Sequence, residues 1–177
     1  MIVAGIDVGS KNVHAVVIKD GEVVARASVL SGFDHEESAT RGLAEAAAAA
    51  GLLREQIDLV AATGAGRKAL SFALEQPTEV AADARGAHAL FPGARTVVDV
   101  GADEARAIRI DDSGKVLDFA INEKCAAGAG AFVEAMSRAL EMSLEDFSRA
   151  SLDSKQSIPM SPGGVFTTPW PAGSPQW

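Results

Sequence analysis

The tripeptide Asp-Val-Gly occurs twice in this sequence, beginning at Asp7 and at Asp99, and each copy directly follows a short apolar run. A glycine at a turn lets backbone N–H groups approach an anion without a side chain in the way. An aspartate beside that glycine can hold Mg²⁺ through water and orient a nucleophilic water. Ser10 adds a hydroxyl that can donate to a phosphate oxygen. Two such turns facing each other would hold a nucleoside triphosphate, whereas the simpler interpretation is a pair of ordinary hairpin turns.

The two motifs belong to a longer internal duplication. GIDVGSKNVHAVVIKDGEVV, at residues 5–24, matches VVDVGADEARAIRIDDSGKVL, at residues 97–117, as strand, Asp-Val-Gly turn, strand, Asp/Gly turn and strand. Repetition of this kind reports architecture. We therefore expect an α/β protein with two similar subdomains, over residues 1–94 and 95–156, followed by an aberrant tail rich in proline, glycine and tryptophan over residues 157–177.

Local signals place the elements that carry these motifs. Apolar or alternating runs that end at turn residues predict strands over residues 2–7, 13–18, 22–29, 57–62, 96–100, 104–110 and 115–122. Capping residues and helical spacing predict helices from Asp34 to Gly51, over residues 67–74, 82–90 and 130–140, and from Ser143 to residue 150.

Composition limits the classes of function. Apolar residues make up 47% of the 177 residues and charged residues 23%, as in ordinary globular proteins. The net charge of −8, without a Lys/Arg block, argues against nucleic acid and against an anionic membrane surface as partners. No apolar run approaches the roughly 20 residues that span a bilayer. The single cysteine cannot form an internal disulfide, which favours a cytoplasmic location.

The duplicated arrangement resembles the superfamily of actin, sugar kinases and heat-shock-70 ATPases, and four motifs narrow this resemblance. GIDVGS, ATGAGR, VVDVGA and NEKCAAGAGAF occur in the order and spacing of ATPases of the BadF/BadG/BcrA/BcrD type. These are the activators of 2-hydroxyacyl-CoA dehydratases and the ATP-binding subunits of benzoyl-CoA reductase. The resemblance covers roughly residues 1–157 and implies an actin-like fold with the first lobe complete and the second partial.

The resemblance also implies a function. Such proteins bind Mg-ATP between two lobes, and dimers of like subunits share one [4Fe–4S] cluster. ATP hydrolysis then drives a low-potential electron into a partner acyl-CoA reductase or dehydratase. Carried over by position, the resemblance gives catalytic roles to Asp7 and Asp99 and makes Cys125 a cluster ligand. It gives cofactor binding to the residues that follow each of these three: Gly9, Ser10, Lys11, Gly101, Ala102, Asp103, Gly128 and Gly130.

The surroundings of Cys125 agree with a ligand role. A thiolate binds the iron of such clusters, and a helix N-terminus just after the cysteine stabilises a thiolate through its dipole. Small neighbours such as Gly128 and Gly130 let a second subunit approach closely. A lone cysteine is otherwise typical of a buried, small apolar side chain.

The sequence departs from the family pattern at two places. Many activators have Gly-Gly-Gln-Asp where this chain has Gly-Ala-Asp-Glu from Gly101, which favours the delta-type subunit of benzoyl-CoA reductase. The family's second cysteine soon follows a segment like SIPMS, whereas here SIPMS at residues 157–161 runs into the tail. Rereading the tail in a shifted frame permits a helical sequence similar to what the family carries further downstream, so we expect an internal deletion with a frame change.

Two other functions remain as alternatives. The first is a truncated, non-catalytic remnant or interaction module with a half-built nucleotide cleft, which a measurement of Mg-ATP affinity would distinguish. The second is a small-molecule kinase of the same superfamily. The kinase has less support, because it leaves the loop around Cys125 unexplained.

Overall fold

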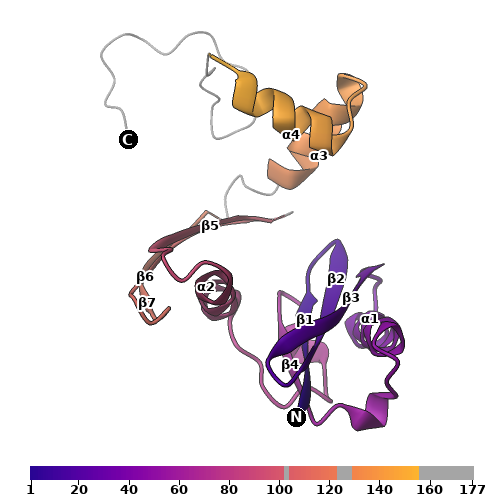
Figure 1. The fold of residues 1–177 in the computed structure, drawn as a ribbon. Helices are drawn as coiled ribbons and strands as arrows, with labels where there is room; N and C mark the ends of the chain where they lie inside the picture. The colour runs from indigo at the N-terminus through magenta and orange to yellow at the C-terminus, as the bar shows by residue number, and fades with distance from the viewer. Residues whose placement is uncertain (102–103, 123–128, 156–177) are drawn as a thin grey trace. The chain divides into compact units, whose positions relative to one another are not determined.

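The computed structural model describes residues 1–101, 104–122 and 129–155 (Figure 1). The chain falls into two compact units, of which the first comprises Met1–Val97 and Ile108–Phe119. The second comprises Val98–Ala107 and the described residues from Ala120 onward. The elements, in chain order, are β1(Ile2–Val8), β2(Asn12–Lys19), β3(Glu22–Leu30), α1(His35–Ala49), η1(Arg54–Gln56), β4(Leu59–Thr63), η2(Arg67–Ala69), α2(Glu79–Leu90), β5(Thr96–Val100), β6(Ala105–Ile110), β7(Val116–Asn122), α3(Ala129–Ala139) and α4(Leu144–Asp153).

The first sheet has the strand order β3-β2-β1-β4. Strand β1 is antiparallel to β2 and parallel to β4, so the end of β1 lies between two neighbours. The turn from β2 to β3 confirms the Asp-Gly hairpin signal, since Asp20 and Gly21 both have positive φ, 52° and 90°. This is the backbone that a two-residue hairpin turn of this hand requires.

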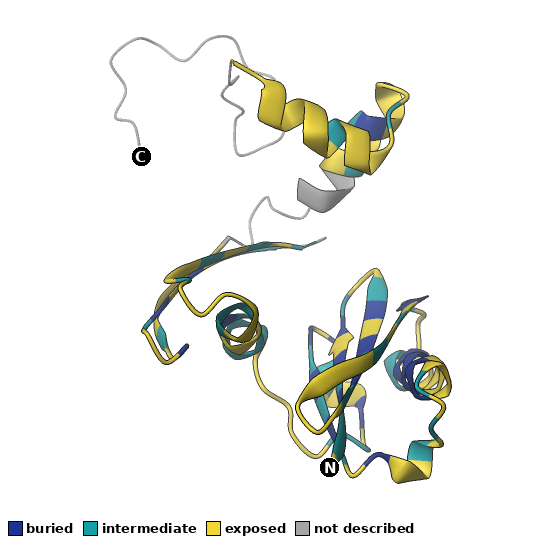
Figure 2. Cartoon of the chain, viewed as in Figure 1, coloured by how far each residue is buried: buried dark blue, intermediate teal, exposed yellow. Residues whose placement is uncertain are grey.

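Helix α1 packs on the first sheet through a face of small residues (Figure 1). Its start is capped as expected, because the Asp34 side chain accepts the N–H of Glu37, and Gly51 follows its end with a φ of 67°. At Gly42 an added Cβ would lie 3.4 Å from Cγ2 of Val29 on β3, so the helix lies close to the strands. The buried residues of α1 and the sheet form one core (Figure 2), which includes Ile6, Val8, Val13, Val17, Ala39, Leu43, Ala46 and Ala47.

The expected helix over residues 67–74 is wrong. The structure has only the short helix η2, Arg67–Ala69, and after a turn at residues 71–72 the chain passes beside β4, where Ala61 and Glu75 form a parallel bridge. Tertiary bonds capture the backbone groups that a helix would use, since the Ser71 N–H donates to the Glu36 carboxylate at 3.0 Å and the Leu74 N–H to Val60. In this segment the contacts with β4 and α1 override the helix propensity of the sequence.

The second sheet has the strand order β5-β6-β7. One face packs with α2 around Ala84, Ile108 and Ile110. The helix starts at Glu79, three residues before the expected start, because Thr78 caps it by accepting the N–H of Ala81. Strand alternation turns a second row of apolar side chains away from this core, and these are exposed: Val98, Val100, Leu117, Phe119 and Ile121.

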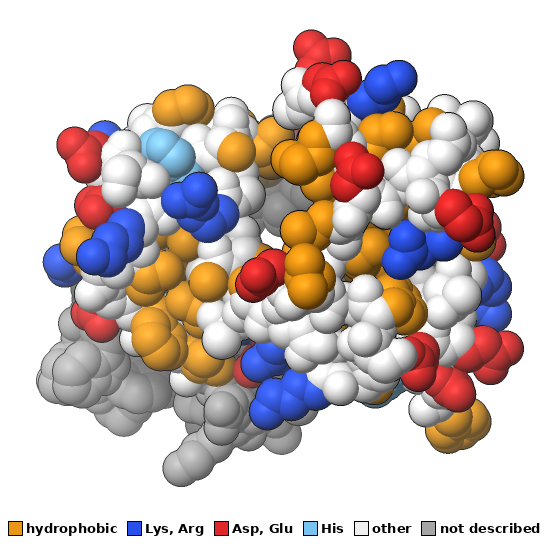
Figure 3. All heavy atoms as spheres, turned by 90° about the horizontal axis from the view of Figure 1, so that it is seen from below, with side chains coloured by type: hydrophobic (Ala, Val, Ile, Leu, Met, Phe, Trp, Pro, Cys, Tyr) orange, Lys and Arg blue, Asp and Glu red, His pale blue; other side chains and the backbone are white. Residues whose placement is uncertain are grey.

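The last two described helices, α3 and α4, contact each other. Ser143 caps α4 as expected, accepting the N–H of Asp146. On the face of the molecule shown in Figure 3, basic and acidic side chains are interspersed and form no patch of one sign. Among the described helices, none combines the length and the apolar character needed to cross a membrane.

Candidate functional site

The first Asp-Val-Gly motif ends β1 and makes a tight turn into β2. Gly9 donates its N–H to the carbonyl oxygen of Asn12 at 3.0 Å, so Ser10 and Lys11 are the inner residues of the turn, and both are exposed. The Lys11 carbonyl accepts the N–H of Ser31 at 2.9 Å, which ties the turn to the end of β3. Because the Gly9 N–H is used inside the turn, an anion here would be bound by the inner amides and not by that of the glycine.

Asp7 lies at the exposed end of β1, beside the loop that follows β4. Gly64 in this loop has a φ of +90°, and a Cβ on it would lie 2.5 Å from Oδ1 of Asp7. Gly66 donates its N–H to the carbonyl oxygen of Val8 at 3.0 Å. Only a residue without a side chain lets the backbone pass this close to the carboxylate. The loop therefore forms a narrow cradle at the end of β1.

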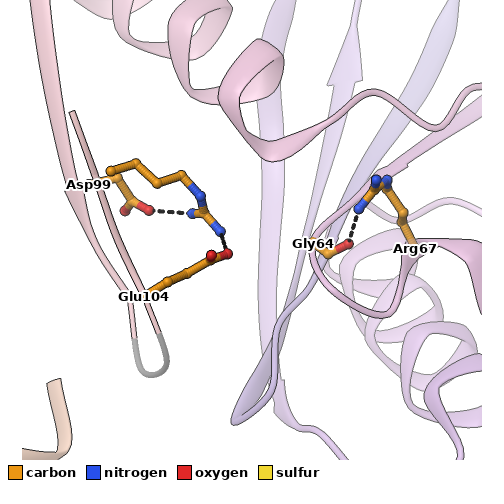
Figure 4. Close-up of polar contacts among 5 residues, drawn as sticks. Gly64, Arg67, Asp99 and Glu104 are labelled. Carbon is orange, nitrogen blue, oxygen red and sulfur yellow. Dashed lines mark hydrogen bonds and ion pairs between the residues drawn. The ribbon is translucent and has the colours of Figure 1, made fainter. Parts of the chain in front are cut away.

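Two further polar groups belong to this loop. Nη1 of Arg67 donates to the carbonyl oxygen of Gly64 at 3.0 Å (Figure 4), which folds the guanidinium back onto the loop. The Thr63 hydroxyl, in register with Asp7, is buried and has no hydrogen-bond partner among the described residues. The motif ATGAGR supported the family resemblance, but sequence reasoning gave Gly64 and Arg67 no part in the site. Their signal was the pair of glycines directly after a strand that ends beside Asp7.

The second Asp-Val-Gly motif repeats the backbone of the first. Gly101 donates its N–H to the carbonyl oxygen of Glu104 at 2.9 Å, as Gly9 does to Asn12. A Cβ on Gly101 would lie 3.3 Å from this carbonyl oxygen, and one on Gly9 would lie 3.0 Å from its counterpart. The duplication seen in the sequence is therefore present in the turns themselves. Ala102 and Asp103, the inner residues of the second turn, lie outside the described residues.

An arginine binds both carboxylates beside the second turn. Nη1 of Arg106 on β6 donates to Oδ2 of Asp99 on β5 at 2.7 Å, and Nη2 contacts the Glu104 carboxylate (Figure 4). The Arg106 side chain is only 8% exposed. Sequence reasoning missed Arg106, although the aligned duplication places it at the position of His14, which is in register with Asp7.

The loop expected to bind a cluster falls largely outside the described residues. Cys125 and Gly128 are not described, whereas Gly130 lies in the first turn of α3. Within the described part of the chain, no group of three or more His, Cys, Asp or Glu side chains is arranged to hold a metal ion. One cysteine per chain gives two thiolates in a dimer, whereas a [4Fe–4S] cluster takes four. The donor set of this chain alone does not fit the cluster.

The residues around the first turn fit a phosphate–metal pair. Carboxylate and hydroxyl oxygens, such as those of Asp7 and Ser10, are the ligands that Mg²⁺ prefers. The cradle at Gly64 brings backbone close to the Asp7 carboxylate, and the Thr63 hydroxyl adds a polar group without a described partner. The first turn can therefore present oxygen ligands next to backbone N–H groups, which is the chemistry that a phosphate–metal pair needs.

Relatives of the chain are known by sequence. The activator of lactoyl-CoA dehydratase from Anaerotignum propionicum is 39% identical over 161 residues, covering 91% of this chain and 62% of that protein. One of the subunits of benzoyl-CoA reductase from Thauera aromatica is 35% identical over 158 residues, covering 85% of this chain and 55% of that protein. The chain thus spans less than two thirds of the length of the curated relatives that it matches.

The fold is also shared with a solved structure of the same kind. The activator of 2-hydroxyisocaproyl-CoA dehydratase from Clostridium difficile, solved with bound ADPNP, superposes with a TM-score of 0.79 at 33% identity. The match covers 91% of this chain and 60% of that one. The expected actin-like α/β fold is therefore confirmed. A family model matches residues 4–158, and the chain belongs to the BadF/BadG/BcrA/BcrD ATPase family.

Proposed function

We propose that this chain supplies the phosphate-binding part of an ATPase that activates an acyl-CoA dehydratase or forms a subunit of an acyl-CoA reductase. The observation that carries the proposal is the repeated turn, Gly9 to Asn12 and Gly101 to Glu104, each directly after an aspartate. Membership of an ATPase family supports the same assignment. The division into lobes over residues 1–94 and 95–156 is part of this proposal.

The residues of the two turns bind either the metal ion or the phosphates of the nucleotide. Asp7 and Asp99 hold Mg²⁺ through water and orient the water that attacks the terminal phosphate. The inner amides of the first turn, with the Ser10 hydroxyl and the Lys11 ammonium, bind phosphate oxygens. Gly101, Ala102 and Asp103 do so from the second lobe, and Gly128 and Gly130, which follow Cys125 in the sequence, also take part in cofactor binding. The relative solved with ADPNP supports a nucleotide as the ligand.

The electron-transfer part of the proposal rests on Cys125. We propose that it gives one thiolate to a [4Fe–4S] cluster shared with a like subunit. Cys125 would hold one iron of such a cluster, and the cluster would supply a low-potential electron for the partner enzyme. The other ligands must come from outside this chain, because it has one cysteine. The dehydratase-activator and reductase relatives support a partner that acts on an acyl-CoA.

Calorimetric titration with ADPNP, with and without Mg²⁺, tests nucleotide binding. We expect the wild-type chain to bind more tightly with Mg²⁺, and D7N and D99N to weaken this Mg²⁺-dependent binding about tenfold or more. D112N is the matched control, because Asp112 lies in the exposed β6–β7 turn, and it should bind like the wild type. A wild-type chain without Mg²⁺-dependent binding would reject the proposal for this chain and favour the non-catalytic module.

Anaerobic reconstitution with iron and sulfide tests the cluster ligand. The wild-type chain should bind more iron than C125A, because Cys125 is the only thiol that the chain can offer to iron. Equal iron uptake by both proteins would reject Cys125 as a ligand while leaving the nucleotide site untouched.

A further inference from the structure

Arg106 is the only charged residue that is buried in the described part of the chain, at 7% exposure. It lies on β6 in the inward row that also holds Ile108 and Ile110, which pack in the second core. A charged group is removed from water only at a large cost unless it is paired. The carboxylates of Asp99 and Glu104 supply that pairing.

The two carboxylates flank the second turn. Asp99 lies two residues before Gly101, and the backbone carbonyl oxygen of Glu104 closes the turn by accepting the Gly101 N–H. The Arg106 guanidinium contacts both of them, and its planar fork fixes orientation as well as charge.

The first turn has the same backbone but a different side chain at this position. In the aligned duplication, His14 stands where Arg106 stands in the second copy, and His14 is exposed. Each turn therefore has the same kind of backbone hydrogen bond. Only the second turn is followed by a strand with a buried cation at this position. This difference points to a task that is specific to the second turn.

We propose that Arg106 is a positioning residue, which holds Asp99 and the hydrogen bond between Gly101 and Glu104 in the geometry that binds the Mg²⁺ of the nucleotide. The proposal rests on the function proposed above. Partners that orient a metal-binding carboxylate change metal affinity strongly when they are removed. Without Arg106, Asp99 and Glu104 would repel each other, and the Gly101 N–H bond would open more often.

Hydrogen exchange measured by NMR on the full chain tests the positioning directly. In R106Q, the amide of Gly101 should exchange about tenfold faster, as expected for the loss of one well-formed hydrogen bond. The amide of Gly9, in the equivalent turn, serves as the internal control and should not change. R109Q, which removes an exposed arginine from the same strand, is the matched control variant. R106K, which keeps the charge but loses the fork, should lie between wild type and R106Q.

Titration with ADPNP separates this role from general stability. R106Q should lose about tenfold in affinity with Mg²⁺ present and change little with Mg²⁺ absent, and R106K should recover part of the loss. An unchanged Gly101 exchange rate in R106Q would overturn the proposal. If the wild type binds Mg-ADPNP, an equal effect of Mg²⁺ on the ADPNP affinities of R106Q and the wild type would also overturn it. If the wild type binds no nucleotide, the proposed function fails, and the exchange rates of Gly101 and Gly9 alone decide whether Arg106 holds the turn.

Discussion

Gly64 approaches Asp7 so closely that a Cβ on the glycine would lie 2.5 Å from Oδ1 of the aspartate. The same Cβ would also lie 2.5 Å from the carbonyl oxygen of Val8. The backbone of the loop after β4 thus packs against the end of β1 at Asp7, the residue proposed to hold Mg²⁺. The shape of the cradle depends on the absence of a side chain at residue 64.

Replacing Gly64 by alanine should destabilise the fold by more than about 3 kcal/mol. The estimate combines roughly 1–2 kcal/mol for a positive φ with the cost of overpacking. Gly21 has the same φ of +90° with nothing within 4 Å of an added Cβ, so G21A should cost only the first part. Urea unfolding of both variants measures the difference, and equal losses would show that crowding against Asp7 is not important.

Leu43 on α1 is 1% exposed in the first core, and L43A should lower the free energy of unfolding by about 2–5 kcal/mol, because it leaves a cavity. Leu53 is 69% exposed, and L53A should cost less than about 0.5 kcal/mol. Thermal or urea unfolding compares the two. A loss of under about 1 kcal/mol in L43A would mean that the helix does not pack on the sheet as described.

The Asp34 side chain accepts the Glu37 N–H at 3.0 Å, and D34A should lower the free energy of unfolding by about 1 kcal/mol. Asparagine caps helices as well as aspartate, so D34N should cost only a few tenths of that amount. This pair of variants separates the acceptor oxygen from the charge. If D34N loses as much as D34A in urea unfolding, the charge and not the cap explains the effect.

Asp111 gives a pH dependence to the turn between β6 and β7. The Ser113 hydroxyl, with the backbone N–H groups of Lys115 and Ser113, holds the pKa of Asp111 below its ordinary value of 3.8. Its contribution to stability is therefore complete above pH 3.8 and is lost as the pH falls through the lowered folded-state value. An NMR titration of the Asp111 carboxyl should show its pKa rise in S113A, which removes the largest cause, and not in S71A. An unchanged pKa in S113A would contradict this.

The turns and most of the elements were predictable because their signals are local. Asp20 and Gly21, the caps Asp34 and Ser143, and Gly51 act through the backbone of adjacent residues, so short windows of sequence reveal them. The structural equivalence of the two Asp-Val-Gly turns followed from repetition, which is also visible without any coordinates.

The rest depends on contacts between segments that are distant in the sequence. The sequence predicts a helix over residues 67–74, but the Glu36 carboxylate accepts the Ser71 N–H and the Gln76 side chain donates to the Leu70 carbonyl. Arg106 looks like a solvent-facing strand residue until the strand register turns it inward. The roles of all the site residues stay predictions, and Cys125 and the inner residues of the second turn also lie outside the described residues.

Backbone hydrogen bonds within the chain join the first turn to its surroundings. The Lys11 carbonyl accepts from Ser31 and the Val8 carbonyl accepts from Gly66, so the end of β3 and the loop after β4 both hold the end of β1 and its turn. A phosphate arriving at Ser10 and Lys11 would meet backbone that is already ordered. The conformational entropy of this turn is then lost during folding and not during association, which favours fast, lock-and-key binding on this side of the nucleotide.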